Sequence, residues 1–136
     1  MKFIFIDTSA WLALVNKSDK FHEMAKSVRN NLIKQNIKFI LTDYIIAEIG
    51  NCLSRIPFRE TAIKLIDSIK ESENIEIIKI DEKIFDKAWD LYSSRKDKEW
   101  GFTDCTSFIV MKEKNIIKAF STDHHFEQAG FKILLK

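Results

Sequence analysis

Short apolar runs alternate along this chain with longer stretches in which apolar residues recur at helical spacing. The continuous runs predict buried strands at residues 2–6, 37–42, 75–80, 116–121 and 132–135. The helical spacing predicts helices at residues 11–16, 19–35, 44–55, 58–70, 82–95, 104–114 and 125–129. Residues suited to capping helix N-termini stand just before three of these helices: Asp43, Asp81 and Thr103.

Strands that alternate with helices favour right-handed crossover connections and parallel strand pairing. The pattern therefore predicts an α/β fold, a three-layer α/β/α sandwich with a mainly parallel central sheet. A length of 136 residues, without internal repeats or low-complexity stretches, suits one domain over residues 1–136.

Composition points to an ordinary globular protein, with 46% hydrophobic and 31% charged residues. No apolar run approaches the roughly 20 residues that a membrane span needs, and the N-terminus is charged too soon for a signal peptide. The chain has only two cysteines, Cys52 and Cys105, and both fall on apolar stripes of predicted helices. We expect small buried thiols in a reducing compartment, and so a cytoplasmic protein with no membrane association.

Four acidic residues follow predicted strands or lie in the first turns of predicted helices: Asp7, Glu48, Asp104 and Asp123. The carboxyl ends of parallel strands meet at one edge of a sheet, where α/β proteins bind ligands. Four carboxylates there would form a site for hard divalent cations, and hence for phosphate chemistry. Each acid also has a plain structural interpretation, as a helix cap, a side chain bordering an apolar stripe, a helix-dipole partner or a turn residue.

The distribution of charge adds to this interpretation. With 22 basic and 20 acidic residues, neutralising four acids with metal would leave 22 against 16, a charge of +6 elsewhere. Such a surface suits a polyanionic substrate. Candidate phosphate contacts lie in the loop after the first helix and in the loop before Asp104: Lys17, Lys20, Arg95, Lys96 and Lys98. The latter loop also holds Trp100 and Phe102, for which we expect burial against the sheet rather than stacking on a base.

Several other chemistries lack their sequence signatures. With three glycines in all, phosphate-binding Walker and dinucleotide fingerprints are excluded. The serine-hydrolase pattern Gly-x-Ser-x-Gly is absent. His124 and His125 lack a second His or Cys pair at zinc-site spacing, which argues against a zinc centre.

Four segments together resemble the PIN-domain ribonucleases, and most of all their single-domain VapC-type toxins. They are Phe-Ile-Asp-Thr-Ser-Ala-Trp, Ala-Glu-Ile-Gly-Asn, Phe-Thr-Asp-Cys-Thr-Ser-Phe and Ser-Thr-Asp-His-His-Phe-Glu-Gln-Ala-Gly-Phe. The resemblance implies a parallel sheet between helices and a Mg²⁺- or Mn²⁺-dependent endonuclease acting on single-stranded RNA. It also implies a homodimer and a cognate antitoxin whose tail enters the cleft.

The resemblance places the family's acids at Asp7, Glu48, Asp104 and Asp123. Its hydroxyls beside the first and last acids correspond to Thr8 or Ser9, and to Thr122. Some members carry a further Asp one turn after the third acid, where this chain has Phe108.

Two other functions stay open at this point. The first is a PIN-like module that binds RNA or protein and cleaves nothing, against which the four intact acids argue. The second is a metal-dependent phosphatase or phosphodiesterase, although Ser9 stands where one large phosphatase family has its second Asp. For the homodimer, residues 58–70 offer more apolar residues than one buried face needs, although core packing would also explain them: Ile63, Leu65, Ile66 and Ile69.

Overall fold

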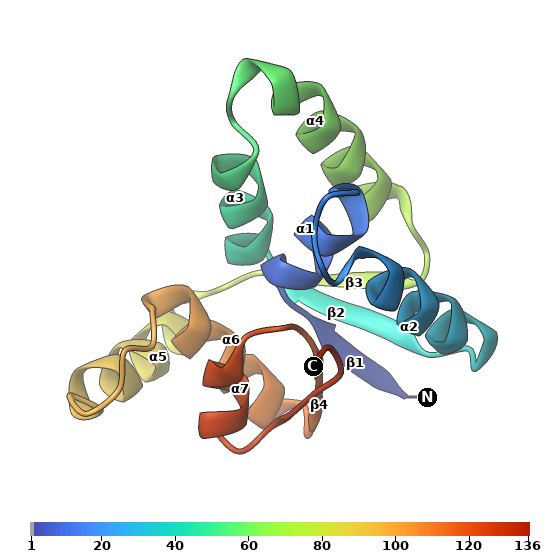
Figure 1. The fold of residues 1–136 in the computed structure, drawn as a ribbon. Coiled ribbons are helices and arrows are strands. Elements are labelled where there is room, and N and C mark those ends of the chain that lie inside the picture. The colour runs from blue at the N-terminus through green and yellow to red at the C-terminus, as the bar shows by residue number, and fades with distance from the viewer. Residues whose placement is uncertain (1) are drawn as a thin grey trace.

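A computed structural model describes residues 2–136 of the chain. The elements follow in the order β1 (Phe3–Ile6), α1 (Thr8–Val15), α2 (His22–Lys34), β2 (Lys38–Thr42), α3 (Asp43–Cys52), α4 (Ile56–Glu71), β3 (Ile75–Ile78), α5 (Glu82–Ser94), α6 (Phe102–Glu113), β4 (Lys118–Phe120), α7 (His124–Gln128) and β5 (Lys132–Ile133) (Figure 1). All of them correspond to predicted elements, with ends that differ by a few residues.

The strands form one sheet of five, in the order β3-β2-β1-β4-β5, and every neighbouring pair is parallel. Strand β1 lies at the centre between β2 and β4, so its carboxyl end is flanked on both sides. The prediction of an α/β fold with a parallel central sheet is confirmed.

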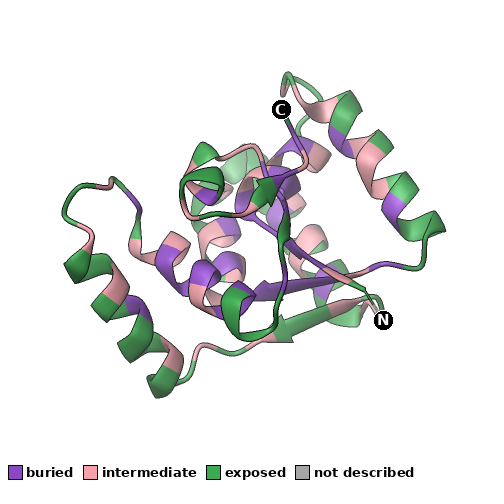
Figure 2. Ribbon diagram, turned by 90° about the horizontal axis from the view of Figure 1, so that it is seen from below, coloured by how far each residue is buried: buried purple, intermediate pink, exposed green. Residues whose placement is uncertain are grey.

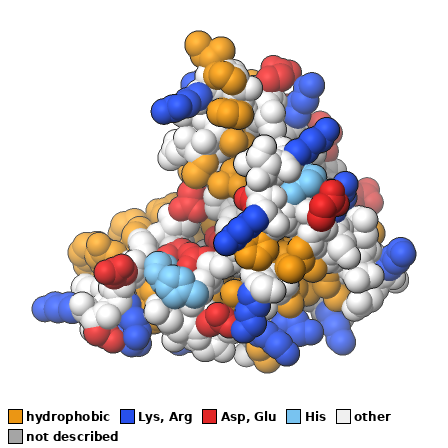
Figure 3. All heavy atoms as spheres, viewed as in Figure 1, with side chains coloured by type: hydrophobic (Ala, Val, Ile, Leu, Met, Phe, Trp, Pro, Cys, Tyr) orange, Lys and Arg blue, Asp and Glu red, His pale blue; other side chains and the backbone are white. Residues whose placement is uncertain are grey.

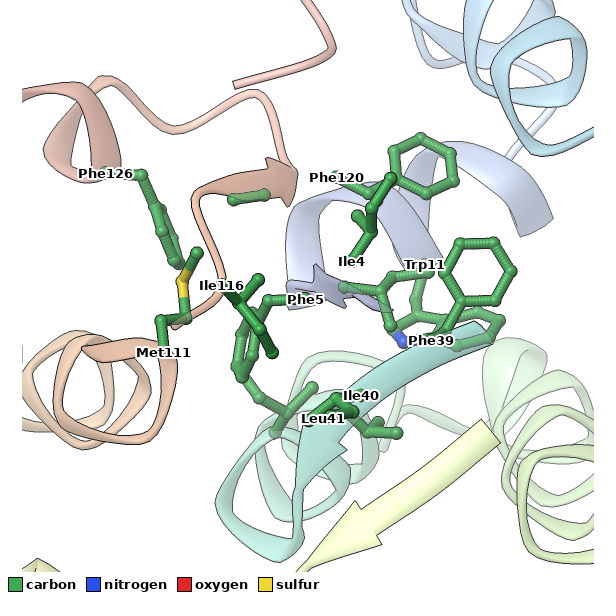
Figure 4. Packing of buried hydrophobic residues seen from close by; sticks show 14 of the residues in the cluster. Ile4, Phe5, Trp11, Phe39, Ile40, Leu41, Met111, Ile116, Phe120 and Phe126 are labelled. Carbon is green, nitrogen blue, oxygen red and sulfur yellow. The ribbon is translucent and has the colours of Figure 1, made fainter. Parts of the chain in front are cut away.

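Helices cover both faces of the sheet. On one face, Ile6 and Phe39 meet side chains from α1, α2 and α4, among them Trp11 and Ile69. On the other face, Phe5 packs against Phe126 of α7, with ring centroids 6.1 Å apart, while α5 packs on α6. Figure 4 shows Phe5, Met111 and Phe126 on one side of the strands and Ile4, Trp11 and Phe39 on the other. In Figure 2 the buried residues are concentrated on the strands and on the inward faces of the helices.

Two predicted caps are wrong, because a neighbouring residue does the capping. Thr42 caps α3 by accepting a hydrogen bond from the Ile45 amide (3.2 Å), whereas the Asp43 carboxylate accepts one from the Ile80 amide (2.9 Å). Helix α6 begins at Phe102, with Gly101 rather than Thr103 at its N-cap. The cap at Asp81 is confirmed, since its carboxylate accepts from the Ile84 amide.

Two further expectations need correction. Helix α1 begins at Thr8, directly after β1, so that Asp7 is its N-cap. Cys105 is buried as predicted, but Cys52 is exposed because it lies in the last turn of α3, at the end of a helix hairpin. Within residues 2–136, no helix combines the length and the apolar character needed to cross a bilayer.

Candidate active site

Asp7 stands at the carboxyl end of the central strand. Its backbone N–H extends the ladder by donating to the Phe120 carbonyl (3.1 Å), which fixes it between β1 and α1. The side chain is only 5% exposed, and its Oδ2 accepts hydrogen bonds of 2.9 Å from the hydroxyls of Ser9 and Ser121. Burial raises the pKa of Asp7 to about 6; the two hydroxyls oppose the rise, and the charges of Asp104 and Glu48 add to it.

Asp104 lies in the first turn of α6. Its Oδ2 accepts a hydrogen bond from the Gly101 amide (3.2 Å), which orients the carboxylate at the helix N-terminus. Burial raises the pKa of Asp104, and the charge of Asp123 raises it further, so these two carboxylates are close enough to repel each other.

Asp123 caps the short helix α7. Its Oδ1 accepts from the His125 amide (2.9 Å), and its own amide donates to the hydroxyl of Ser121 (2.9 Å). Because Ser121 also donates to Asp7, this one hydroxyl connects the first and last acids. Ser121, the buried residue directly after β4, therefore helps to position both carboxylates.

Glu48 enters the site from α3. Its Oε1 accepts a hydrogen bond from the Thr8 hydroxyl, which joins α3 to the first turn of α1. The charge of Glu48 raises the pKa of Asp7, and together with burial it also raises the pKa of the Cys52 thiol. All four predicted acids thus converge from four separate segments (Figure 3 shows acidic side chains beside the histidines of α7).

Two of the predicted hydroxyls donate hydrogen bonds to acids of the site. Ser9 holds Asp7, and Thr8 holds Glu48. Thr122 contributes its amide, which donates to the Ser9 Oγ (3.0 Å), but its hydroxyl has no hydrogen-bond partner in the part of the chain that the structure describes. The hydroxyl beside the last acid belongs to Ser121, which the pattern-based prediction missed because it was assigned to a buried strand.

His125 is a second residue that the sequence pattern did not identify as part of this site. Its Nδ1 lies 3.2 Å from Asp104 Oδ2 and 3.4 Å from Asp123 Oδ1, so the ring bridges the two carboxylates. The available signal was its position two residues after Asp123, at the start of a helix, but only the packing of α7 on α6 brings it to Asp104.

Residues 4–132, which are nearly the whole chain, match the PIN domain. The chain belongs to the PIN domain family. The 23S rRNA-specific endonuclease VapC20 of Mycobacterium tuberculosis is 30% identical to it over 129 residues, which are 94% of this chain and 95% of that protein.

Solved structures agree with this membership. The crystal structure of Mycobacterium tuberculosis VapC20, described as a Sarcin-Ricin loop cleaving toxin, superposes with a TM-score of 0.83 at 29% identity, covering 94% of this chain and 95% of that one. VapBC2 from Rickettsia felis, bound to a DNA fragment from their promoter, shares the fold with a TM-score of 0.73 at 16% identity, covering 96% of each chain. FitAcB from Neisseria gonorrhoeae does so with 0.67 at 16% identity, covering 96% and 95%.

The third acid of this PIN domain is not followed by a further carboxylate. Phe108 is fully buried, and its ring packs between those of Trp100 and Phe126, with centroids 5.1 and 5.0 Å away. Ser107, one turn after Asp104, has a buried hydroxyl without a hydrogen-bond partner among residues 2–136. The site therefore comprises four carboxylates.

The predicted basic residues of the second loop line one hollow, together with Glu99. Arg95, Lys96 and Lys98 line a hollow of about 660 Å³ that reaches Gly101 and Cys105, the neighbours of Asp104. Asp97 engages two of them: it accepts two hydrogen bonds from Arg95 (3.0 and 3.1 Å) and lies 3.6 Å from Lys98.

Trp100 forms part of the wall of this hollow. It is buried as expected, its Nε1 donates to Gln128 (2.9 Å), and the Arg95 guanidinium lies 5.1 Å from the ring centroid. Phe102, for which burial was also expected, is only half-buried and packs on the Phe85 ring of α5, with centroids 4.9 Å apart.

The predicted contacts Lys17 and Lys20 lie in the loop after α1. This helix has eight residues and is about 12 Å long, and Asp7 lies at its opposite end.

The donor set of this PIN domain fits a hard divalent cation. Four carboxylates with adjacent hydroxyls are the ligands that Mg²⁺ and Mn²⁺ favour, and burial of Asp7 among like charges leaves a deficit of positive charge. Ligand atoms of Asp123, His124 and His125 lie within 4.8 Å of one another, but His124 is exposed and His125 Nδ1 also lies 3.2 Å from Asp104 Oδ2. Oxygen ligands thus dominate, which disfavours zinc.

Proposed function

We propose that this protein is a metal-dependent endoribonuclease that hydrolyses phosphodiester bonds of single-stranded RNA, and that residues 1–136 form one nuclease domain. The observation that carries the proposal is the convergence of Asp7, Glu48, Asp104 and Asp123 on one sheet edge around a buried carboxyl group. RNA as the substrate is supported by the 30% identity to a 23S rRNA-specific endonuclease over 94% of this chain.

In this proposal the four acids would hold Mg²⁺ or Mn²⁺, and the bound cation would supply charge neutralisation at the scissile phosphate and activation of the attacking water. Ser9 and Ser121 fix the Asp7 carboxylate through its Oδ2, so that its geometry is set before any ligand arrives. Thr8 does the same for Glu48, and the Gly101 amide does it for Asp104. His125 spans the mouth between Asp104 and Asp123 and fixes their separation.

We propose that the hollow beside Asp104 guides the RNA strand into the site. Lys96 lines this hollow and has no carboxylate partner in the described part of the chain. Cations in such a hollow suit contacts with the phosphates of a strand without regard to its sequence. Arg95 and Lys98 would need to leave Asp97 to take part, whereas Lys17 and Lys20 would contact a more distant stretch of the substrate.

We further propose that the protein is the toxin of a toxin–antitoxin pair, acts in the cytoplasm and forms a homodimer. The toxin proposal is supported by the description of VapC20 as a toxin. Two exposed apolar surfaces are available for protein partners: one at the start of α4 (Ile56, Phe58, Ile63), and one formed by α5 (Phe85, Trp89, Tyr92). Hydrophobic side chains gather over these two helices in Figure 3.

Cleavage of mixed single-stranded and structured RNA tests the enzymatic proposal. Purified protein is assayed with Mg²⁺, with Mn²⁺ and with EDTA, beside an Asp7→Asn, Asp104→Asn double variant. We expect cleavage that needs metal and is lost in the double variant. Full cleavage by the double variant would refute the four-acid site.

The alternatives are separated by two further measurements. Turnover of a small phosphomonoester in preference to RNA would favour the phosphatase. RNA binding and calorimetric metal binding without cleavage of any RNA would favour a non-catalytic binding module.

A further inference from the structure

The edge of the sheet opposite the acids carries a set of lysines that the site described above does not use. Lys2 precedes β1, Lys114 ends α6, and Lys118 and Lys132 begin β4 and β5. We call these four residues the lysine edge. All four are exposed, and none is paired with a carboxylate within residues 2–136.

Two of these lysines are direct neighbours on adjacent parallel strands, because Lys118 is the register partner of Lys132. Their backbones are therefore only about 4.8 Å apart, and like charges in such pairs destabilise a sheet. A cation at a helix C-terminus is favoured by the helix dipole, which accounts for Lys114 but not for Lys2, Lys118 and Lys132. The juxtaposition of Lys118 and Lys132 becomes favourable when an anion lies across them.

The lysine edge also borders a defined depression. Lys2, Lys114 and Lys118 line a hollow of about 430 Å³, together with the polar side chains of Gln35 and Asn115. Among the lining residues the structure describes there is no carboxylate, so the local potential is positive. In Figure 3 basic side chains gather along the lower edge of the molecule, where the strands begin.

We propose that the lysine edge is a second RNA site, which holds the phosphate backbone of a base-paired segment while another segment is cut at the acids. This inference rests on the proposed function. A row of cations across neighbouring strands matches a row of phosphates, and the amides of Gln35 and Asn115 suit phosphate oxygens and ribose hydroxyls. A membrane surface fits less well, because Ile117 is the one strongly exposed apolar residue that lines this hollow in the described chain.

The two RNA sites are far enough apart to be tested separately. From Lys2 to Asp7 the chain runs along β1 for five residues, which is about 17 Å. A short oligonucleotide that contains only the cut site would occupy the acids, whereas a folded RNA with a long stem would span both sites.

Binding is measured by fluorescence anisotropy on an RNA hairpin with a long stem, over a series of salt concentrations, in an Asp7→Asn background that leaves the RNA intact. The edge variant carries Lys114→Gln, Lys118→Gln and Lys132→Gln. The matched control carries Lys64→Gln, Lys70→Gln and Lys83→Gln, three exposed lysines on α4 and α5 with the same change in charge. We expect the edge variant to bind at least about tenfold more weakly, with a slope of log K against log salt reduced by about two to three, while the control changes little.

In the active protein, the edge variant should raise KM for the hairpin and leave cleavage of the short oligonucleotide unchanged. Equal effects of the two triple variants, or no effect of the edge variant, would overturn the proposal. So would an edge variant that loses binding to phosphatidylglycerol vesicles but keeps its binding to the hairpin. Because the anisotropy measurement needs no cleavage, it decides on the lysine edge even if the protein proves not to be a nuclease.

Discussion

At the scale of single residues, Asp7 shows how the site is prepared for a cation. A carboxyl group that is 5% exposed and surrounded by other acids is costly to ionise, and its pKa of about 6 expresses that cost. The folded protein keeps this group protonated up to about pH 6, whereas the unfolded chain loses the proton near 3.8. Its contribution to stability is therefore full below about pH 4 and is lost as the pH rises through about 6.

The Asp7→Asn substitution should accordingly stabilise the metal-free protein at about pH 8, by about 1–3 kcal/mol, because Asn has no charge to desolvate. The gain should shrink towards zero at about pH 4, where Asp7 is already neutral. Urea denaturation at both pH values, in EDTA, measures it. Asp90→Asn, at an exposed position of α5, is the control with the same change of charge; a loss of stability in Asp7→Asn at about pH 8 would contradict the assignment.

Ser121 and Thr122 offer a direct comparison of two neighbouring hydroxyls. Ser121 connects Asp7 and Asp123, whereas the Thr122 hydroxyl makes no hydrogen bond within residues 2–136. We expect Ser121→Ala to lower kcat for RNA cleavage by about 10–100-fold and Thr122→Ala to change it less than about threefold. Single-turnover cleavage of one RNA by both variants measures this, and the reverse order would show that Thr122 is the supporting hydroxyl.

At the scale of elements, the order and type of the helices and strands could be read from periodicity, because each strand is a short apolar run between helical stretches. The caps were less predictable. Thr42 and Asp43 are both good N-cap residues, and only the pairing of β2 with β3, in which Thr42 lies opposite Ile78, brings the Asp43 carboxylate to the Ile80 amide. Likewise Thr103 lies inside α6, because Gly101 is the N-cap of that helix. The Gly101 amide donates to the carboxylate of Asp104, three residues later.

The site itself was predictable to a similar degree. The four acids could be found because each follows a strand or lies in the first turns of a helix in the sequence. His125 and Ser121 could not, since their importance depends on contacts with residues 21 and 114 positions away. Cys52 illustrates the opposite error, because an apolar stripe predicts burial only where another element covers it.

Helix α6 also determines how many acids the site can hold. Phe108 is fully buried against Trp100 and Phe126, so its side chain belongs to the core and not to the site. We expect Phe108→Asp to cost about 4 kcal/mol or more, since it opens a cavity and buries a charge, and to supply no additional metal ligand. Thermal unfolding, with Phe108→Leu as the mild control, measures the loss; a folded Phe108→Asp protein with tighter metal binding would contradict this.

At the scale of the whole molecule, a cation at the acids should be linked to global stability, because a ligand that binds only the folded state raises its free energy of unfolding. Mg²⁺ or Mn²⁺ at about 100 times its Kd should stabilise the protein by about 2.7 kcal/mol. Differential scanning calorimetry with and without EDTA tests this. The Asp7→Asn, Asp104→Asn variant is the control, and an identical upward shift of its Tm would place the bound ion elsewhere.

The exposed aromatic surface of α5 makes a prediction about assembly. Trp89 and Tyr92 stack on each other with centroids 5.5 Å apart, while remaining 52% and 44% exposed. If this surface forms the homodimer, a Trp89→Ser, Tyr92→Ser variant should elute as a monomer. Light scattering after gel filtration measures the mass. Ile33→Ser on α2, at another exposed apolar position, should leave the assembly unchanged, and a dimer that survives the double substitution would exclude α5.

The parallel sheet has a consequence for how this molecule meets its target. Because all five strands run the same way, the acids gather where the strands end and the lysine edge lies where they begin. These two groups of side chains therefore contribute an electric moment along the strands, with its negative pole at the acids. Near a polyanion the metal-free molecule would turn its lysine edge towards that polyanion. A cation bound at the acids would weaken this preference. Metal occupancy would thus govern the orientation of the first encounter, before any bond is cut.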